Sequence, residues 1–168
     1  MANVVRGMVE GIGIADTLPV NPLYFTEVTI PETLTIPAAK PDMEQLLSIQ
    51  VEAVVVSVRS VVTPIGISNE GQSISGAKII IELKLREKIK YVADEPTQSV
   101  HAAHFENVFT SIFVVVPPTV GGVPISDLLA SNRVTVTPYI EDIYGTMRDK
   151  RTIFKNTTVL VDVTIRTV

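Results

Sequence analysis

The sequence predicts an all-β protein, an antiparallel β-sandwich or partly open barrel with one short helix and an extended N-terminal arm. Apolar and charged residues alternate through residues 77–93, which is the period of a strand. Clusters of turn residues separate several further stretches of this kind. Hydrophobic residues make up 46% of the chain and are mainly valine and isoleucine, whose branched side chains favour sheets. The 168 residues suit one domain with its own core.

The predicted arm covers residues 1–22, ahead of a single β-domain at 23–168. It carries apolar side chains that favour burial over contact with water. The arm residues expected to take part in assembly are Val4, Val5, Val9, Ile12 and Ile14. Two roles are open for the arm. It is either a first strand of the domain's own sheet, or a strand that pairs with the sheet edge of a neighbouring subunit.

Residues 23–37 form a predicted strand at a sheet edge, or two short strands, because Pro31 cannot donate a hydrogen bond to a neighbouring strand. Residues 40–47 are the best helix candidate. Pro41 stands in the first turn, and the acidic residues beside it suit the N-terminal end of a helix.

Residues 49–65 form a long predicted strand whose apolar face switches partway. That switch indicates a bulge near residues 54–56, or burial on both sides. The turn residues at 68–71 end this strand. Residues 77–93 follow as the clearest strand of the chain. Its apolar face is interrupted by Glu87, and its other face is charged.

The second half of the chain continues the same pattern. Residues 94–97 predict a turn, and residues 101–113 a strand with three phenylalanines. Residues 117–132 are rich in proline and glycine and predict a long loop, with one helical turn at 126–130. Residues 133–144 and 157–168 return to strand, joined by a charged connection at 145–155.

Composition argues against several functional classes. Fourteen basic and 18 acidic residues give a net charge of −4, so no basic surplus is available for nucleic acid. The absence of cysteine rules out disulfides and thiolate chemistry. Neither a secretory signal nor an apolar run long enough for membrane insertion is visible. We therefore expect synthesis in the cytoplasm.

No group of residues predicts catalysis, a cofactor or a metal site. His101 and His104 are three positions apart, so in a strand they point to opposite faces and cannot share one ion. The acidic pairs Asp94–Glu95 and Glu141–Asp142 each lack an identifiable partner for acid–base chemistry, and turn formation or solvation explains them better. The chain is expected not to be an enzyme.

A stripe of basic residues lies along the charged face of residues 77–93, at Lys84, Arg86, Lys88 and Lys90. Such a stripe is usually a solvated surface. The alternative is a charged strip that meets acidic residues of another subunit or a polyanion.

Three long segments resemble a known family. They are VTIPETLTIPAAKPDMEQLLSIQVE, YVADEPTQSVHAAHF and VTVTPYIEDIYGTMRDKRTIFKNTTVLVDV. In these segments the chain is similar to the SPOCS domain, a spore-coat-associated domain of endospore-forming Firmicutes, over roughly residues 23–165. Larger members add a peptidoglycan-binding LysM module after this domain. We expect a stand-alone member here, so wall binding is not transferred.

The resemblance implies a non-enzymatic β-domain that assembles proteins at the spore surface. We expect a homo-oligomer, as a ring, layer or filament, joined through sheet edges and the N-terminal arm and located in the spore coat or an appendage. Other spore-coat proteins are candidate partners. The alternative is a monomeric binding module for a coat protein or a carbohydrate, using the 117–132 loop and the region of Tyr139 and Tyr144. The residues assigned to an interface are Lys84, Arg86, Lys88, Lys90, Tyr91, Asp94, Glu95, His101, His104, Tyr139, Glu141 and Asp142.

Overall fold

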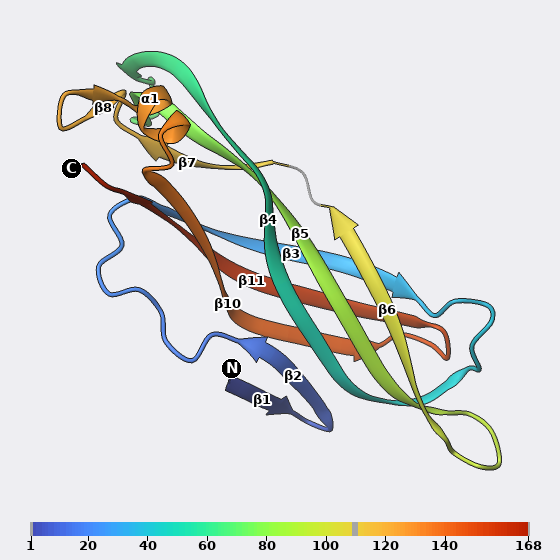
Figure 1. The fold of residues 1–168 in the computed structure, drawn as a ribbon. Helices are drawn as coiled ribbons and strands as arrows, with labels where there is room; N and C mark the ends of the chain where they lie inside the picture. Colours follow the sequence, from blue (N-terminus) through green and yellow to red (C-terminus); the bar gives the residue numbers. More distant parts are fainter. Residues whose placement is uncertain (1, 109–110, 168) are drawn as a thin grey trace.

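Two open β-sheets face each other in the computed structural model, which describes residues 2–108 and 111–167 (Figure 1). The larger sheet has the strand order β1-β2-β4-β5-β6, with β7 paired to β5, and the smaller one has the order β10-β11-β3. The strands are β1 (Ala2–Arg6), β2 (Val9–Ile14), β3 (Phe25–Thr35), β4 (Met43–Ile67), β5 (Ser73–Ala93), β6 (Val100–Val108), β7 (Ile112–Val116), β8 (Thr119–Val120), β9 (Val123–Pro124), β10 (Val134–Met147) and β11 (Thr152–Ile165). Neither sheet closes on itself, so the all-β sandwich is confirmed and the molecule is not a barrel.

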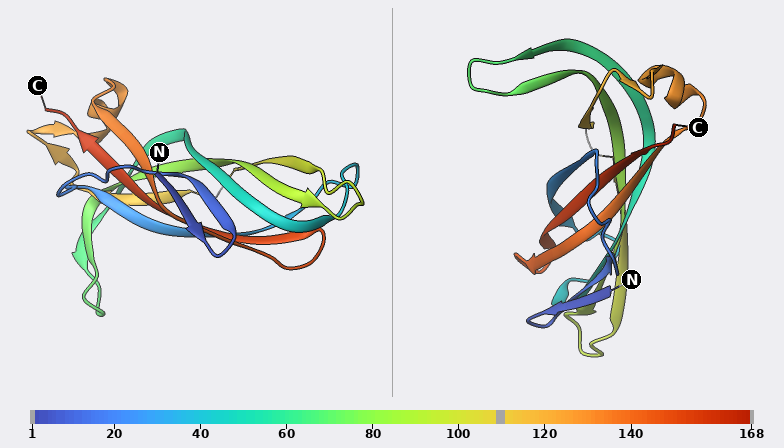
Figure 2. Two further views of the ribbon diagram at one scale, coloured as in Figure 1. Left: turned by 90° about the horizontal axis from the view of Figure 1, so that it is seen from below. Right: turned by 90° about the vertical axis from the view of Figure 1, so that its left-hand side faces the viewer.

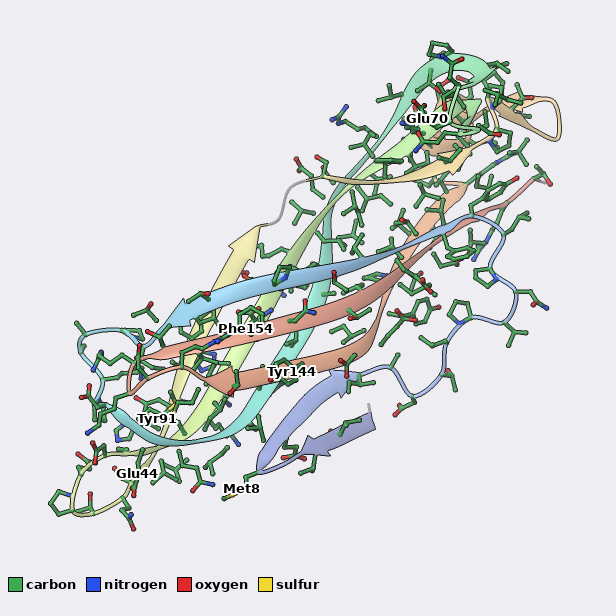
Figure 3. All side chains as sticks on the ribbon, turned by 180° about the vertical axis from the view of Figure 1, so that it is seen from behind. Met8, Glu44, Glu70, Tyr91, Tyr144 and Phe154 are labelled. Atoms are coloured by element: carbon green, nitrogen blue, oxygen red, sulfur yellow. The ribbon has the colours of Figure 1, made fainter. Side chains whose placement is uncertain are left out.

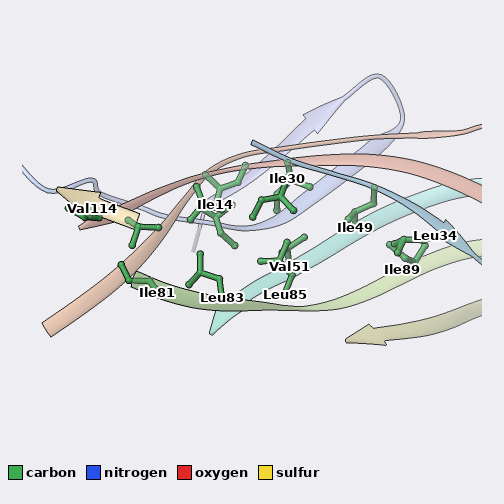
Figure 4. Close-up of a cluster of buried hydrophobic side chains, with 14 of the residues drawn as sticks. Ile14, Ile30, Leu34, Ile49, Val51, Ile81, Leu83, Leu85, Ile89 and Val114 are labelled. Carbon is green, nitrogen blue, oxygen red and sulfur yellow. The ribbon is translucent and has the colours of Figure 1, made fainter. Parts of the chain in front are cut away.

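The core lies between the two sheets (Figure 4). Alternate residues of β5 point into it, among them Ile79, Ile81, Leu83, Leu85, Ile89 and Tyr91. The smaller sheet supplies Ile153, Val159, Val161 and Val163 from β11. The predicted faces of residues 77–93 are therefore confirmed. Side chains of this kind each stabilise the fold by roughly 1.5–3 kcal/mol when fully buried.

Strands β4 and β5 form one long hairpin that continues beyond the sandwich and bends away from it (Figure 2). A register shift between Val55 and Ser57 marks the bulge that the sequence predicts. At the tip, the Gly71 N–H donates to the Ser68 carbonyl at 2.9 Å, which confirms the predicted turn. β5 is flanked by β4 on one side and by β6 and β7 on the other.

The N-terminal residues form a hairpin on the chain's own larger sheet instead of an extended arm. β2 runs parallel to β4, with Gly11 beside Ile49, whereas β1 pairs only with β2. The Ala15 N–H donates to the Ile140 carbonyl of the smaller sheet at 2.8 Å, and Ile14 is buried. Of the two roles predicted for the arm, the structure shows the first, pairing within the domain's own sheet.

The helix predicted at residues 40–47 is wrong, because β4 already begins at Met43. Met43 is fully buried and pairs with Ala93 of β5. The preceding turn is stabilised by Arg151, whose guanidinium donates to the Pro37 carbonyl at 2.8 Å and pairs with Asp42. Tertiary contacts thus override the helix-like spacing of acidic residues.

Other boundaries differ from the prediction. The charged connection is shorter than residues 145–155, because β10 extends to Met147 and β11 starts at Thr152. The 117–132 loop contains the small β8–β9 hairpin and helix α1 (Ile125–Ala130), which confirms the helical turn. The strand predicted at 101–113 consists of β6 and β7, on different parts of β5, and Phe109 lies outside the described residues.

Proline 31 does not interrupt its strand. β3 runs through Pro31, which stands opposite Asn156 of β11. Because β3 is at the end of the smaller sheet, this confirms the prediction of an edge strand.

Candidate functional site

The turn after β5 contains the acidic pair Asp94–Glu95, as the sequence predicts. The Ser99 hydroxyl donates to Glu95, and this hydrogen bond lowers the pKa of the Glu95 carboxyl below its usual value. His101 Nε2 lies 3.7 Å from Glu95 Oε1, and Lys150 pairs with Asp94. These contacts join the turn to β6 and to the connection between β10 and β11.

Tyr91 was predicted as an interface residue, and this is wrong, because its side chain has no exposed surface. Its hydroxyl donates to the Pro41 carbonyl at 3.0 Å, and its ring stacks on His101 with 5.9 Å between centroids. Figure 3 shows Tyr91 at the end of the molecule opposite Glu70, which lies at the hairpin tip. The turn that follows β5 and the projecting hairpin therefore lie at opposite ends of the molecule.

The basic stripe is partly neutralised within the chain. Lys84 Nζ lies 2.8 Å from Glu106 Oε1 of β6, and Arg86 Nε lies 3.0 Å from the same oxygen. The hydrogen bond from Lys84, and then that from Arg86, lower the pKa of Glu106. Lys88 and Lys90 make no ion pair with the described residues. This arrangement fits a solvated face better than a strip of free cations.

The remaining predicted site residues do not converge. Regular pairing of β6 with β5 places His101 and His104 on opposite faces, as predicted.

Tyr139, Glu141 and Asp142 lie on β10, and Tyr139 lines a groove of about 470 Å³ beside β2 and β4. Burial, and after it the charge of Glu27, raises the pKa of Glu141. Within the described residues, no group of three histidine or acidic side chains is arranged to hold a metal ion.

Large apolar side chains are exposed on the projecting part of the β4–β5 hairpin. Val62, Ile65 and Ile67 are 83%, 76% and 75% exposed. Between residues 60 and 77 the sequence has a single charge, Glu70. An exposed, nearly uncharged β-ribbon with unpaired backbone groups is a typical site of strand addition.

A cluster of three charged residues is buried between the sheets. Glu87 projects inward from β5, and Lys155 and Glu32 stand opposite each other on β11 and β3 of the other sheet. Lys155 Nζ lies 2.6 Å from Glu87 Oε1, is in ion-pair contact with Glu32 and donates to Thr157 Oγ1 at 3.1 Å. The Lys155 and Glu87 side chains have no exposed surface, and that of Glu32 is 9% exposed.

This cluster brings one ammonium group together with two carboxyl groups. Burial, followed by the neighbouring Glu32 carboxyl, raises the pKa of Glu87 to about 8, although Lys155 acts in the opposite direction. Burial thus favours the neutral acid form of Glu87. Burying an ion costs several kcal/mol, and an ion pair inside a core often contributes less stability than apolar residues of the same size.

One member of this cluster, Glu87, has a signal in the sequence. Glu87 stands out as the one charged residue on the apolar face of β5. Lys155 falls in the charged connection predicted at residues 145–155. The sequence prediction therefore does not place it among the inward residues of β11. Extending the alternation of Val159, Val161 and Val163 backwards would have placed Lys155 on the buried face.

No protein-family model, curated protein or solved structure matches this chain. The similarity to the SPOCS domain therefore stays a prediction made from the three segments quoted above. Among the helices of the described residues, none has the length and apolar character needed to cross a membrane.

Proposed function

We propose that this chain is a non-enzymatic structural protein that assembles with copies of itself at the spore surface. The projecting β4–β5 hairpin is the observation that carries the proposal. It extends two strands past the core that stabilises them and exposes Val62, Ile65 and Ile67. Burying these side chains against another subunit removes apolar surface from water, at roughly 25 cal/mol per Å².

Open sheet edges provide the complementary half of such a contact. In the strand order of the described residues, β1, β3, β6 and β10 stand at the ends of the two sheets. A hairpin strand from one copy can add to such an edge of the next copy, with main-chain hydrogen bonds giving affinity and side chains giving register. β1 would act here as a sheet edge, since the arm is already paired with β4 through β2.

The spore coat or a spore appendage, as the location, rests on the SPOCS-like segments alone. Other coat proteins are further candidate partners on the same ground. The absence of enzymatic activity is likewise part of the proposal, supported by the lack of convergence among the predicted site residues.

The test replaces two hairpin residues by lysine, Val62→Lys with Ile65→Lys, and measures particle size by sedimentation velocity and negative-stain microscopy. We expect the unaltered chain to form large particles and the variant to sediment as a monomer, because two charges would be buried in the contact. The matched control is Val20→Lys with Leu23→Lys, at positions 88% and 78% exposed in the segment between β2 and β3, outside the hairpin and the sheet edges.

The control should assemble like the unaltered chain. If the unaltered chain is a monomer at micromolar concentration, self-assembly is rejected and the monomeric binding module becomes the better explanation. If both double variants assemble normally, the hairpin is not the contact.

A further inference from the structure

We propose that Lys155 and Glu87 become joined by an amide bond between their side chains, which links the two sheets covalently. The bond would be made by the chain itself, after folding brings β5 and β11 together. It would leave neutral groups in place of the buried charges of Lys155 and Glu32. The proposal concerns a single subunit and does not depend on assembly.

The geometry fits this reaction. Lys155 Nζ lies 2.6 Å from Glu87 Oε1, so the carboxyl carbon is no more than one C–O bond farther away. Both side chains are fully buried, so bulk water cannot separate them or compete for the carboxyl group. Holding two reactants at such a distance in a fixed orientation replaces a bimolecular collision, and it corresponds to effective concentrations of up to about 10⁵–10⁸ M.

The three side chains also hold the necessary protons. Glu32 accepts one proton from the Lys155 ammonium, which leaves a neutral amine. That amine attacks the carboxyl carbon of Glu87, which burial keeps in its acid form. The nitrogen then loses a second proton by way of Glu32, and the Glu87 hydroxyl leaves as water.

The reaction balances without any other reactant. One N–C bond forms and one C–O bond breaks, and no atom is oxidised or reduced. The products are a secondary amide, a protonated Glu32 and one water molecule. The four protons and zero net charge of the starting groups are conserved.

The two carboxyl groups have different roles because their surroundings differ. Glu87 comes from the centre of the larger sheet and is the more buried of the two, whereas Glu32 is on the edge strand β3 and keeps some contact with solvent. The more buried carboxyl suits the acid that is attacked, and the other suits the base. General-base assistance of this kind typically contributes about 10²–10⁴ in rate.

The decisive measurement is the intact mass of the denatured chain. We expect it to be lower than the sequence mass by one water molecule. Trypsin should then release a branched peptide in which residues 87–88 are attached to residues 152–166, because an acylated Lys155 is no longer cleaved. The full sequence mass, or a branch to the peptide holding Glu32, would overturn the proposal.

Three variants distinguish the Lys155–Glu87 bond from other reactions that remove a water molecule from the chain. Lys155→Met should have its full sequence mass, whereas Lys84→Met, which removes a lysine paired with Glu106 at the surface, should still lack one water. Glu32→Gln should slow bond formation by about 10²–10⁴-fold, leaving unlinked chain after purification. A mass deficit that persists in Lys155→Met would overturn the assignment of the amide bond to Lys155. This conclusion holds whether or not that variant folds well.

Discussion

Gly13 is a residue at which two backbone segments of the chain approach closely. Its φ is 116°, a conformation that other residues rarely adopt, and a Cβ built there would lie 2.1 Å from the Val51 carbonyl oxygen. That oxygen belongs to the backbone of β4 and has little freedom to move. The glycine therefore allows β2 to lie against β4.

We predict that Gly13→Ala destabilises the protein by more than the roughly 1–3 kcal/mol expected from backbone strain alone. The measurement is the urea midpoint of unfolding, at constant slope. Gly7→Ala is the matched control, because Gly7 also has a positive φ, of 64°, but nothing lies within 4 Å of its added Cβ. Equal losses at the two positions would show that the close approach does not matter.

Single residues also show which features of the fold the sequence predicts and which it does not. The inward and outward faces of β5 followed directly from alternation, since a strand has only two faces. Glu87 broke that alternation, but nothing local to it identified Lys155 as its partner. The two residues meet only because the sheets face each other, and that contact is a property of the tertiary fold.

Among the elements, the long β4–β5 hairpin was largely predictable and the N-terminal hairpin was not. The face switch at Val56 and the turn at Ser68–Gly71 are local signals, and both are observed. The start of β4 at Met43 was missed because Pro41 and Asp42 favour a helix start when no tertiary contacts are considered. The parallel pairing of β2 with β4 has no local signal at all.

We predict that deleting residues 1–14 lowers the free energy of unfolding by about 2–5 kcal/mol, because Ile14 leaves the core and β4 loses its neighbour. Chemical denaturation measures this loss. The control deletes only residues 1–6, which removes β1 and leaves the β2–β4 pairing intact, and it should cost clearly less. Both deletions remove the β1 edge, so an assembly defect seen only in the longer deletion would reflect instability. If the two deletions cost the same, β2 contributes nothing beyond β1.

At the scale of the whole molecule, a contact between subunits made by charged residues and one made by apolar residues would respond differently to salt. Lys84 and Arg86 of the basic stripe already have partners in Glu106 and Glu52, whereas the hairpin tip offers apolar side chains. A contact made by the stripe would weaken as salt rises, and a contact made by the hairpin would not.

We predict that assembled particles keep their sedimentation coefficient between about 0.1 M and about 1 M NaCl, although the screening length falls from about 10 Å to about 3 Å. The double variant Arg86→Glu with Lys88→Glu should assemble at the same size as the unaltered chain. Dissociation in high salt, or loss of assembly in that variant, would identify the basic stripe as the contact.

The position of Lys155 and Glu87 in the chain has a mechanical consequence. A pull applied to the two termini travels from the N-terminal side to Glu87, crosses the proposed bond to Lys155 and leaves along the rest of β11. Residues 88–154, which include β6, β7 and β10, would then carry no load and could not be drawn out. A subunit built this way would extend less under tension than the same chain without the bond.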